Sequence, residues 1–304
     1  MVRFPPSSLA SAGMATGRLG AVLAGRYRLG PPIGNSAMAS VLQALDLHSG
    51  EQVAIKMIDL PADLVQRRRW LERLSREADL GRQLHHPDIL NVLATGLNES
   101  QAWIVLERVC GADLSRYTQP SRLLPETLVL RIGARLAAAL AHAHLQGIVH
   151  RDLKPANVLV NLAEGQVKLA DFGIARWDDT DMTRTGLTLG TPSYMAPELL
   201  TGTAASRASD GYALGVLLFE MFTGRRPHLA SSLGELLHQI AREPPTALAS
   251  LRPDLPAPVL VAIEQLLACD PAQRPDDLAR WGAGLARLAA MMSQRLWPDV
   301  VTRL

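Results

Sequence analysis

The composition of this 304-residue chain excludes several classes of protein before any motif is considered. Lysine and arginine number 31 against 29 aspartates and glutamates, and the net charge of +2 provides no general attraction to nucleic acid or to an anionic membrane. The two cysteines, Cys110 and Cys269, fit neither a disulfide framework nor a zinc site, and no uncharged apolar run reaches the ~18 residues of a membrane segment, so we expect a cytoplasmic protein.

The N-terminal third of the chain predicts a small α+β lobe. Residues 1–25 are rich in Ala, Gly, Ser and Pro and predict a disordered leader. From Tyr27 onward, short extended segments separated by turn residues predict an antiparallel meander of five strands, with one helix over residues 63–84. The expected strands are residues 28–29 with 33–34, 41–45, 52–58, 89–93 and 102–107.

The rest of the chain has a mainly helical pattern. Helices are predicted over residues 113–117, 127–146, 208–223, 233–242, 256–268 and 276–294, with short apolar strands at 158–160 and 166–170. We therefore expect an α+β fold of two lobes, residues 27–109 and 110–288, followed by a tail over residues 289–304.

The densest group of polar side chains lies in the octapeptide His-Arg-Asp-Leu-Lys-Pro-Ala-Asn, residues 150–157. These residue types suit phosphoryl transfer, because Asp152 can accept a hydroxyl proton, Lys154 can neutralise phosphate and Asn157 can hold a divalent cation. Their order and spacing resemble the catalytic loop of protein kinases. Lys154 followed by Pro155 is the pattern of the serine/threonine type within that family.

A second carboxylate follows at the end of the predicted strand 166–170, in the tripeptide Asp171-Phe172-Gly173. A carboxylate beside a glycine that permits a sharp turn suits Mg²⁺, which prefers oxygen ligands together with phosphate. The kinase resemblance implies that Asp171 and Asn157 hold Mg²⁺ or Mn²⁺ ions on the phosphates of ATP.

A lysine stands in the predicted strand 52–58, within Val-Ala-Ile-Lys ending at Lys56. A lysine in a strand built for burial needs a partner. The resemblance implies that Lys56 contacts the α- and β-phosphates and pairs with Glu77. Glu72 remains the alternative by helical pattern alone, since two glutamates five residues apart cannot both face inward.

The phosphate-covering loop departs from the family pattern G-x-G-x-x-G. Gly34 keeps the first glycine, whereas Ser36 and Ala39 replace the second and third. If those positions required a positive φ, each replacement would cost ~1–2 kcal/mol, and weaker handling of ATP is therefore a hypothesis.

The resemblance also implies how the purine is bound. Leu106 is the expected gatekeeper, and the hinge that follows it is expected to bond the base edge through its backbone. The implied ATP-binding residues are Ile33, Gly34, Val41, Ala54, Lys56, Glu77, Glu107, Val109 and Leu159.

Three charged residues have implied structural roles. Glu198, in Ala-Pro-Glu, is expected to pair with Arg274, and breaking such a buried pair costs ~3–5 kcal/mol. Asp210 opens an apolar helix, where it could serve as a cap, accept hydrogen bonds from the backbone of residues 150–157, or both.

Threonines are dense between Asp171 and Glu198. Similarity to bacterial Hanks-type kinases implies that Thr183 and Thr185 are autophosphorylated and that Arg151 binds the resulting phosphate. Self-association of the chain would allow one copy to phosphorylate another. Thr191 is expected to help select serine and threonine substrates. A solvated threonine-rich loop is the simpler alternative.

The sequence is therefore identified as a member of the protein kinase superfamily, expected to use ATP with Mg²⁺ or Mn²⁺ to phosphorylate proteins in signal transduction. Two alternatives remain open. The altered phosphate loop favours a pseudokinase scaffold with weak or no phosphoryl transfer. The presence of all four key polar residues argues against it: Lys56, Asp152, Asn157 and Asp171. A small-molecule phosphotransferase would share the catalytic carboxylates, but the Ala-Pro-Glu motif ending at Glu198 favours a protein substrate.

Overall fold

A computed structural model of the chain describes residues 19–35, 39–63, 65–68, 71–72, 81, 83–172 and 192–296. These residues form two compact units. The first unit contains the described residues up to 72 together with 92–108, and the second contains those from 81 to 91 together with 109–296.

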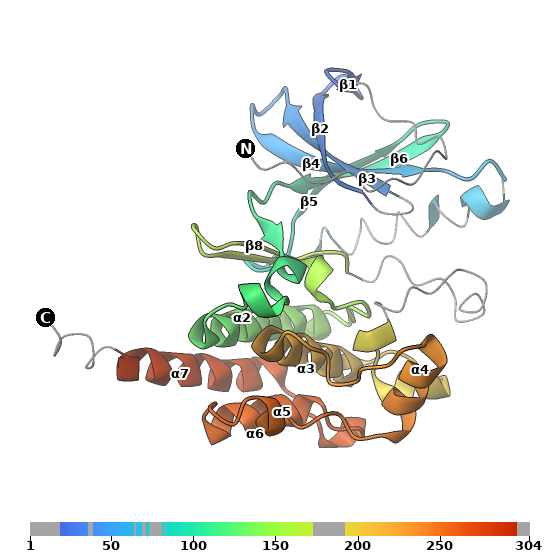
Figure 1. The fold of residues 1–304 in the computed structure, drawn as a ribbon. Coiled ribbons are helices and arrows are strands. Elements are labelled where there is room, and N and C mark those ends of the chain that lie inside the picture. The colour runs from blue at the N-terminus through green and yellow to red at the C-terminus, as the bar shows by residue number, and fades with distance from the viewer. Residues whose placement is uncertain are drawn as a thin grey trace, which may run out of the picture. The chain divides into compact units, whose positions relative to one another are not determined.

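The first unit is built on a six-stranded antiparallel sheet with the strand order β1-β2-β3-β4-β6-β5 (Figure 1). Its strands are β1 (Val22–Leu23), β2 (Tyr27–Asn35), β3 (Ala39–Asp46), β4 (Gln52–Asp59), β5 (Val92–Leu97) and β6 (Gln101–Glu107). Of the helix predicted over 63–84, the described residues 65–68, 71–72, 81 and 83 are helical, whereas the predicted end residues Asp63 and Leu84 are not.

Alternation along the strands separates two faces of this sheet. Val53, Ile55 and Met57 of β4 pack on one face with Trp103 of β6 in an apolar cluster. Ala54, Lys56 and Ile58 therefore point to the opposite face, where Ile58 packs in a second, smaller cluster with Ala39, Ala102 and Ile104. Lys56 thus lies on the face that carries less apolar packing.

Two boundaries in the first unit differ from the sequence expectation. Val22 and Leu23, expected within the leader 1–25, pair with β2 and add a sixth strand to the five predicted. The strand expected over 89–93 instead runs from Val92 to Leu97. Ile89 belongs to the second unit and pairs there with Leu169 in an isolated parallel bridge.

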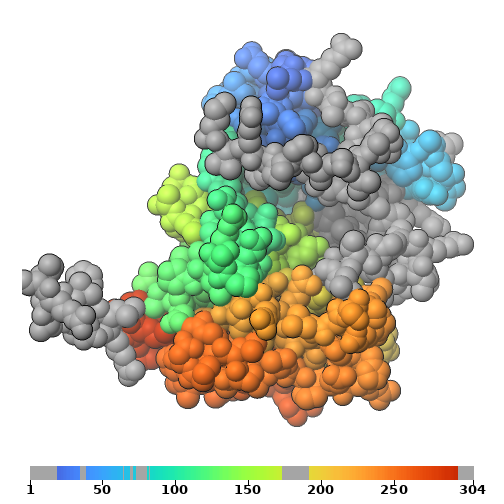
Figure 2. Space-filling view, viewed as in Figure 1, coloured from blue at the N-terminus to red at the C-terminus, as the bar shows by residue number. Residues whose placement is uncertain are grey.

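The second unit combines a small sheet with helices. The sheet has the order β7 (Ala112–Asp113), β8 (Val158–Asn161) and β9 (Gln166–Leu169). The α-helices are α2 (Glu126–Leu145), α3 (Arg207–Thr223), α4 (Leu233–Arg242), α5 (Leu248–Leu251), α6 (Ala257–Leu266) and α7 (Leu278–Leu296). Short 3₁₀ helices are η1 (Leu114–Tyr117), η2 (Pro120–Arg122), η3 (Pro155–Asn157), η4 (Pro192–Tyr194), η5 (Pro197–Thr201) and η6 (Pro271–Gln273). Figure 2 shows α5 and α6, in orange, at the surface of this unit.

The core of the second unit is centred on α3. Every residue of α3 from Ser209 to Phe222 is buried, as expected for a helix that is apolar on all sides. α2 packs against both α3 and α7 (Figure 1). Small residues permit the close crossing with α7, since a Cβ on Gly282 would lie 2.8 Å from the Cβ of Ala137.

α2 is the one helix among the described residues that is long and apolar enough to cross a membrane by length and composition. Ten of its residues are buried, including Leu130, Leu136 and Leu140, and 61% of its most apolar window lies inside the protein. We interpret it as a core helix, as its sequence predicts.

Candidate active site

Asp152 lies in the second unit, on the segment between α2 and β8 that is called the 150–157 loop below. Its Oδ2 accepts a hydrogen bond from Lys154 Nζ at 2.6 Å, and both side chains are partly exposed, at 22% and 24%. The carboxylate is thus held by a neighbouring ammonium and still open to a substrate. This arrangement suits a carboxylate that accepts a proton from a hydroxyl while the ammonium neutralises an anionic group.

Asn157, the last residue of η3, fixes the other side of Asp152. Its Nδ2 donates to the backbone oxygen of Asp152 at 2.7 Å and to Oδ2 of the same residue at 3.1 Å. Because these bonds occupy the amide nitrogen, the amide oxygen Oδ1 is the atom left to face a ligand. An oxygen in this position fits Mg²⁺ or Mn²⁺, so Asn157 is a suitable metal ligand.

The end of β9 is attached to the 150–157 loop by backbone and side-chain bonds. Ala170 donates its N–H to the backbone oxygen of Asn157 at 2.8 Å, and its own oxygen lies 2.9 Å from His150 Nε2. The His150 ring packs on Phe172 with ring centroids 4.7 Å apart. Asp171 is therefore held between two anchored residues, with a φ of +61° that is uncommon for a residue other than glycine.

His150 links these bonds through both ring nitrogens. Its Nδ1 accepts the backbone N–H of Asp152 at 3.2 Å, so Nε2 carries the hydrogen donated to the oxygen of Ala170. One buried imidazole therefore connects the backbone at Asp152 with the residue preceding Asp171.

Asp210, buried near the start of α3, accepts three hydrogen bonds. Its Oδ2 accepts from the backbone N–H of His150 at 2.8 Å and lies 2.7 Å from His144 Nε2, while Oδ1 accepts from the backbone N–H of Arg151 at 2.9 Å. Helix capping, the simpler sequence interpretation, is provided instead by Ser206 and Ser209, whose Oγ accepts the Ser206 N–H at 2.8 Å. Asp210 therefore positions the 150–157 loop.

Glu198 and Arg274 form the ion pair expected from sequence. Nη1 of Arg274 lies 2.7 Å from Oε1 of Glu198, and Nη2 lies 2.8 Å from Oε2. The side chains are 0% and 9% exposed for Arg274 and Glu198 respectively. The guanidinium also lies over the ring of Tyr212, and burial raises the pKa of that tyrosine above its usual range. The pair fixes η5 to the loop before α7.

Sequence reasoning missed a second buried charged group at η4. Tyr194 donates its hydroxyl hydrogen to Glu220 of α3, and Arg226 Nη1 donates to Ser193 Oγ at 2.9 Å. Burial, followed by the nearby charge of Glu220, raises the pKa of Tyr194 above its usual range. A glutamate within the apolar run of α3, six residues before an arginine, was the available sequence signal.

In the first unit, strand register brings several predicted residues into one row. Gly34 of β2 pairs with Val41 of β3, which pairs with Lys56 of β4. Directly paired residues share a face, so these three side-chain positions lie together, and Ala54 shares the same face of β4. Leu106 pairs with Ala54 and so lies on the same face, two residues along the strands from the row that contains Lys56.

The altered glycine position at Ala39 carries no backbone strain. Ala39 is the first residue of β3, pairs with Ile58, and is not among the residues with positive φ. The cost proposed from sequence for a positive φ therefore does not apply there. Ser36 lies outside the described residues.

The remaining predicted residues are divided between the units. Ile33 is 49% exposed in β2, and Glu107 ends β6. In the second unit, Leu159 of β8 pairs with Asp113 and Lys168, and Val109 follows β6. Glu77, Thr183, Thr185 and Thr191 lie outside the described residues.

Comparison with known proteins yields matches over most of the chain. A family model described as the protein kinase domain matches residues 27–280. A probable serine/threonine-protein kinase of Streptomyces coelicolor is 40% identical over 261 residues, which are 83% of this chain and 38% of that protein. Serine/threonine-protein kinase PknA of Mycobacterium tuberculosis is 37% identical over 263 residues, covering 84% of this chain and 60% of PknA.

Solved structures give the same result for the fold. The crystal structure of the M. tuberculosis PknI kinase domain is similar with a TM-score of 0.70 and 30% identity, covering 90% of this chain and 100% of that one. The chain spans less than two thirds of the length of the curated relatives described above.

Proposed function

The chain belongs to the protein kinase family, and we propose that it transfers the γ-phosphoryl group of ATP to serine and threonine hydroxyls of proteins. The observation that carries the proposal is the carboxylate of Asp152, held by Lys154 and Asn157 and still partly exposed. Relatives named as serine/threonine-protein kinases support the same assignment.

In this proposal each residue of the 150–157 loop has one task. Asp152 orients the substrate hydroxyl and accepts its proton, and Lys154 neutralises charge on the transferring phosphoryl group. Asn157 Oδ1 and the Asp171 carboxylate hold Mg²⁺ or Mn²⁺, which when bound neutralises phosphate charge. Positioning and electrostatics thus supply most of the catalysis.

The first unit would bind the nucleotide. Lys56 contacts the α- and β-phosphates and pairs with Glu77 in this proposal. The backbone of Glu107 bonds the purine edge, while Ile33, Gly34, Val41 and Ala54 contact the nucleotide. Val109 and Leu159, which belong to the second unit, are included in the proposal only because the family resemblance implies that they contact ATP. The row formed by Gly34, Val41 and Lys56 across three strands supports this assignment.

Transfer of radiolabelled γ-phosphate to a generic protein substrate, with Mg²⁺ or Mn²⁺, tests the activity. We expect Asp152→Asn to abolish transfer while ATP binding and thermal unfolding stay close to those of the parent chain. Asp276→Asn, which removes an exposed carboxylate of the same unit, serves as the matched control. Nucleotide binding without any transfer by the parent chain would contradict the proposal and favour the scaffold alternative.

Regulation by the activation segment is part of the proposal. Autophosphorylation on Thr183 and Thr185 would place a phosphate that the exposed Arg151 can receive through charge-assisted bonds. Mass spectrometry of the active chain should find phosphate on these threonines and none in Asp152→Asn. Unchanged turnover of the Thr183→Ala, Thr185→Ala double variant would contradict the switch.

We also propose a cytoplasmic location and protein substrates, with autophosphorylation occurring between copies of the chain. Mixing the Asp152→Asn chain with active chain tests transfer between copies. Label on the inactive chain would support it, and label restricted to the active chain would contradict it.

A further inference from the structure

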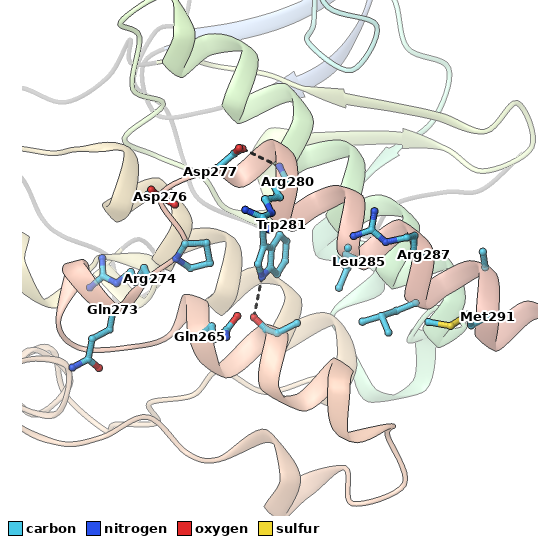
Figure 3. Close-up of a pocket in the computed structure, with 15 residues that line it drawn as sticks. Gln265, Gln273, Arg274, Asp276, Asp277, Arg280, Trp281, Leu285, Arg287 and Met291 are labelled. Carbon is cyan, nitrogen blue, oxygen red and sulfur yellow. Dashed lines mark hydrogen bonds between the residues drawn. The ribbon is translucent and has the colours of Figure 1, made fainter.

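A groove of about 830 Å³ lies between α6 and α7 of the second unit (Figure 3). Its lining contains none of the residues proposed for catalysis, metal binding or ATP binding. The volume is in the range of sites that enclose a ligand or a short protein segment. The proposed phosphoryl transfer therefore leaves this groove without a role.

The floor of the groove is apolar. Leu285, Leu288 and Met291 of α7 line it, and Trp281 bridges to α6 by donating its Nε1 hydrogen to the backbone oxygen of Ala262 at 3.3 Å. Leu285 is buried, whereas Met291 is 51% exposed. The groove thus offers apolar surface that the chain itself only partly covers.

Two arginines flank this floor. Arg280 and Arg287 are seven residues apart on α7, which places them on one side of the helix and about 10 Å apart along its axis. Both are exposed, and within the described residues neither guanidinium has an ion-pair partner. The Arg287 Nη2 lies 3.8 Å from the position that a Cβ on Gly284 would occupy, so this guanidinium lies close over the helix surface.

The acidic residues beside the groove do not neutralise these arginines. Asp277 Oδ1 accepts the backbone N–H of Arg280 at 2.9 Å and so caps the first turn of α7. Asp276 is exposed at the end of the groove. The third arginine of the lining, Arg274, is already paired with Glu198. Two free positive charges therefore remain beside the apolar floor.

We propose that the α6–α7 groove docks a segment of a partner protein with two acidic side chains about two helical turns apart and apolar side chains between them. Carboxylates at that spacing would meet Arg280 and Arg287 through charge-assisted bonds, which are stronger than neutral ones. The apolar side chains would cover Trp281, Leu288 and Met291. Charge complementarity selects the partner, and the apolar floor contributes affinity.

Fluorescence anisotropy with the full chain and a labelled synthetic helix-forming peptide tests the proposal. The probe carries two glutamates two turns apart with leucines on the same face. One control peptide replaces the glutamates with glutamine, and another replaces the leucines with serine. We expect the probe to bind about tenfold more tightly than either control and to weaken as salt is raised.

Variants of the chain locate the binding. Arg280→Glu combined with Arg287→Glu should weaken the probe about tenfold or more, since two attractions become repulsions. The exposed pair Arg116→Glu with Arg122→Glu provides the same charge change elsewhere in the second unit and should leave binding unchanged. Met291→Gln tests the apolar floor and serves as the second variant if the double reversal disturbs folding.

Three results would overturn the proposal. The first is equal binding of the glutamate and glutamine peptides, and the second is full binding by the double-reversal variant. The third is a dimer in sedimentation that the same variant dissolves, which would assign the groove to a second copy of the chain. Each readout is independent of phosphoryl transfer, so loss of the kinase proposal would not affect it.

Discussion

The carboxylate of Asp210 accepts the backbone N–H of Arg151 at 2.9 Å, and this bond ties the buried start of α3 to the residue next to Asp152. Arg151 has a φ of +68°, in the left-handed region that costs a non-glycine residue about 1–2 kcal/mol. Such a conformation persists where surrounding bonds hold it. Asp210 thus positions the loop that carries Asp152, the carboxylate proposed to accept the substrate proton.

Replacing Asp210 by alanine should therefore impair both stability and turnover. His144 and the N–H groups of His150 and Arg151 would lose a buried acceptor, and unsatisfied buried donors cost about 1–3 kcal/mol each. We expect the free energy of unfolding to fall by about 3 kcal/mol, and kcat to fall about 100-fold through displacement of Asp152.

Urea unfolding and steady-state phosphorylation measure these two effects. Ser209→Ala removes a capping hydroxyl one residue away and is the control for a local effect at the start of α3. It should lower stability by about 1 kcal/mol with little change in kcat. Equal losses of kcat in both variants would contradict a positioning role for Asp210.

Asn157→Asp tests the orientation of the Asn157 amide. The new carboxylate oxygen would face the backbone oxygen and Oδ2 of Asp152, where Nδ2 now donates at 2.7 Å and 3.1 Å. Repulsion between these oxygens should displace Asp152, and we expect kcat/KM to fall about 100-fold even though an added charge would attract a cation.

The matched control for this change is Asn98→Asp. Asn98 Oδ1 accepts the backbone N–H groups of Ser100 and Gln101 on an exposed turn, a task that a carboxylate performs equally well. Activity of this variant should match the parent. If Asn157→Asp kept full activity at ordinary Mg²⁺ concentration, the amide hydrogen bonds to Asp152 would be without catalytic importance.

The ion pair between Glu198 and Arg274 should dominate the stability of its region. Glu198→Ala would leave a fully buried guanidinium without its carboxylate, and we expect the free energy of unfolding to fall by about 3–5 kcal/mol. Glu72→Ala, which breaks the exposed pair with Arg68, should change it by less than about 0.5 kcal/mol.

A double-mutant cycle separates the pair from the other bonds of Arg274. That guanidinium also donates to the backbone oxygens of Ala208 at 2.9 Å and Ala268 at 2.8 Å. The Glu198→Ala, Arg274→Ala chain should therefore be less destabilised than the sum of the two single variants, by about 1–3 kcal/mol. Additive losses in urea unfolding would contradict direct coupling.

Local patterns in the sequence predicted the helices and strands better than they predicted contacts between residues far apart in the chain. α4 begins and ends where its periodicity predicts, because Ser232 caps it through the N–H of Glu235. Asp152, Lys154 and Asn157 are close in sequence, so spacing alone placed them together. The expected α+β fold is confirmed, and the described residues contain two short strands, β1 and β7, beyond those predicted.

Residues joined across long stretches of chain were harder to predict. His144 lies within the helix predicted over 127–146, and its bond to Asp210 connects positions 66 residues apart, which no local pattern indicates. The Tyr194 bond to Glu220 likewise depends on tertiary packing of η4 against α3. Ala39 shows the opposite case, in which the family pattern suggested strain and the strand register removed it.

Stability should fall as the solution becomes acidic, because His228 is buried before α4. It is 7% exposed, and desolvation, partly opposed by the charge of Glu243, lowers its pKa below the ordinary 6.5. Below pH 6.5 the unfolded chain therefore binds more protons at this position than the folded one. The contribution of neutral, buried His228 to the free energy of unfolding is fully present above pH 6.5, and it is lost as the pH falls through the lower pKa of the folded state.

Urea unfolding at pH 7.5 and pH 5, on the parent chain and His228→Asn, checks this expectation. The variant should be less stable than the parent at the higher pH, because a buried ring is lost, and the gap should narrow at the lower pH. Burial also lowers the pKa of His86. His86 therefore adds a pH dependence of stability of the same sign, which is common to the parent chain and to His228→Asn. His48→Asn, on an exposed turn, is the control and should be as stable as the parent at both pH values. A stability difference between His228→Asn and the parent that is the same at pH 7.5 and pH 5 would contradict the role assigned to His228.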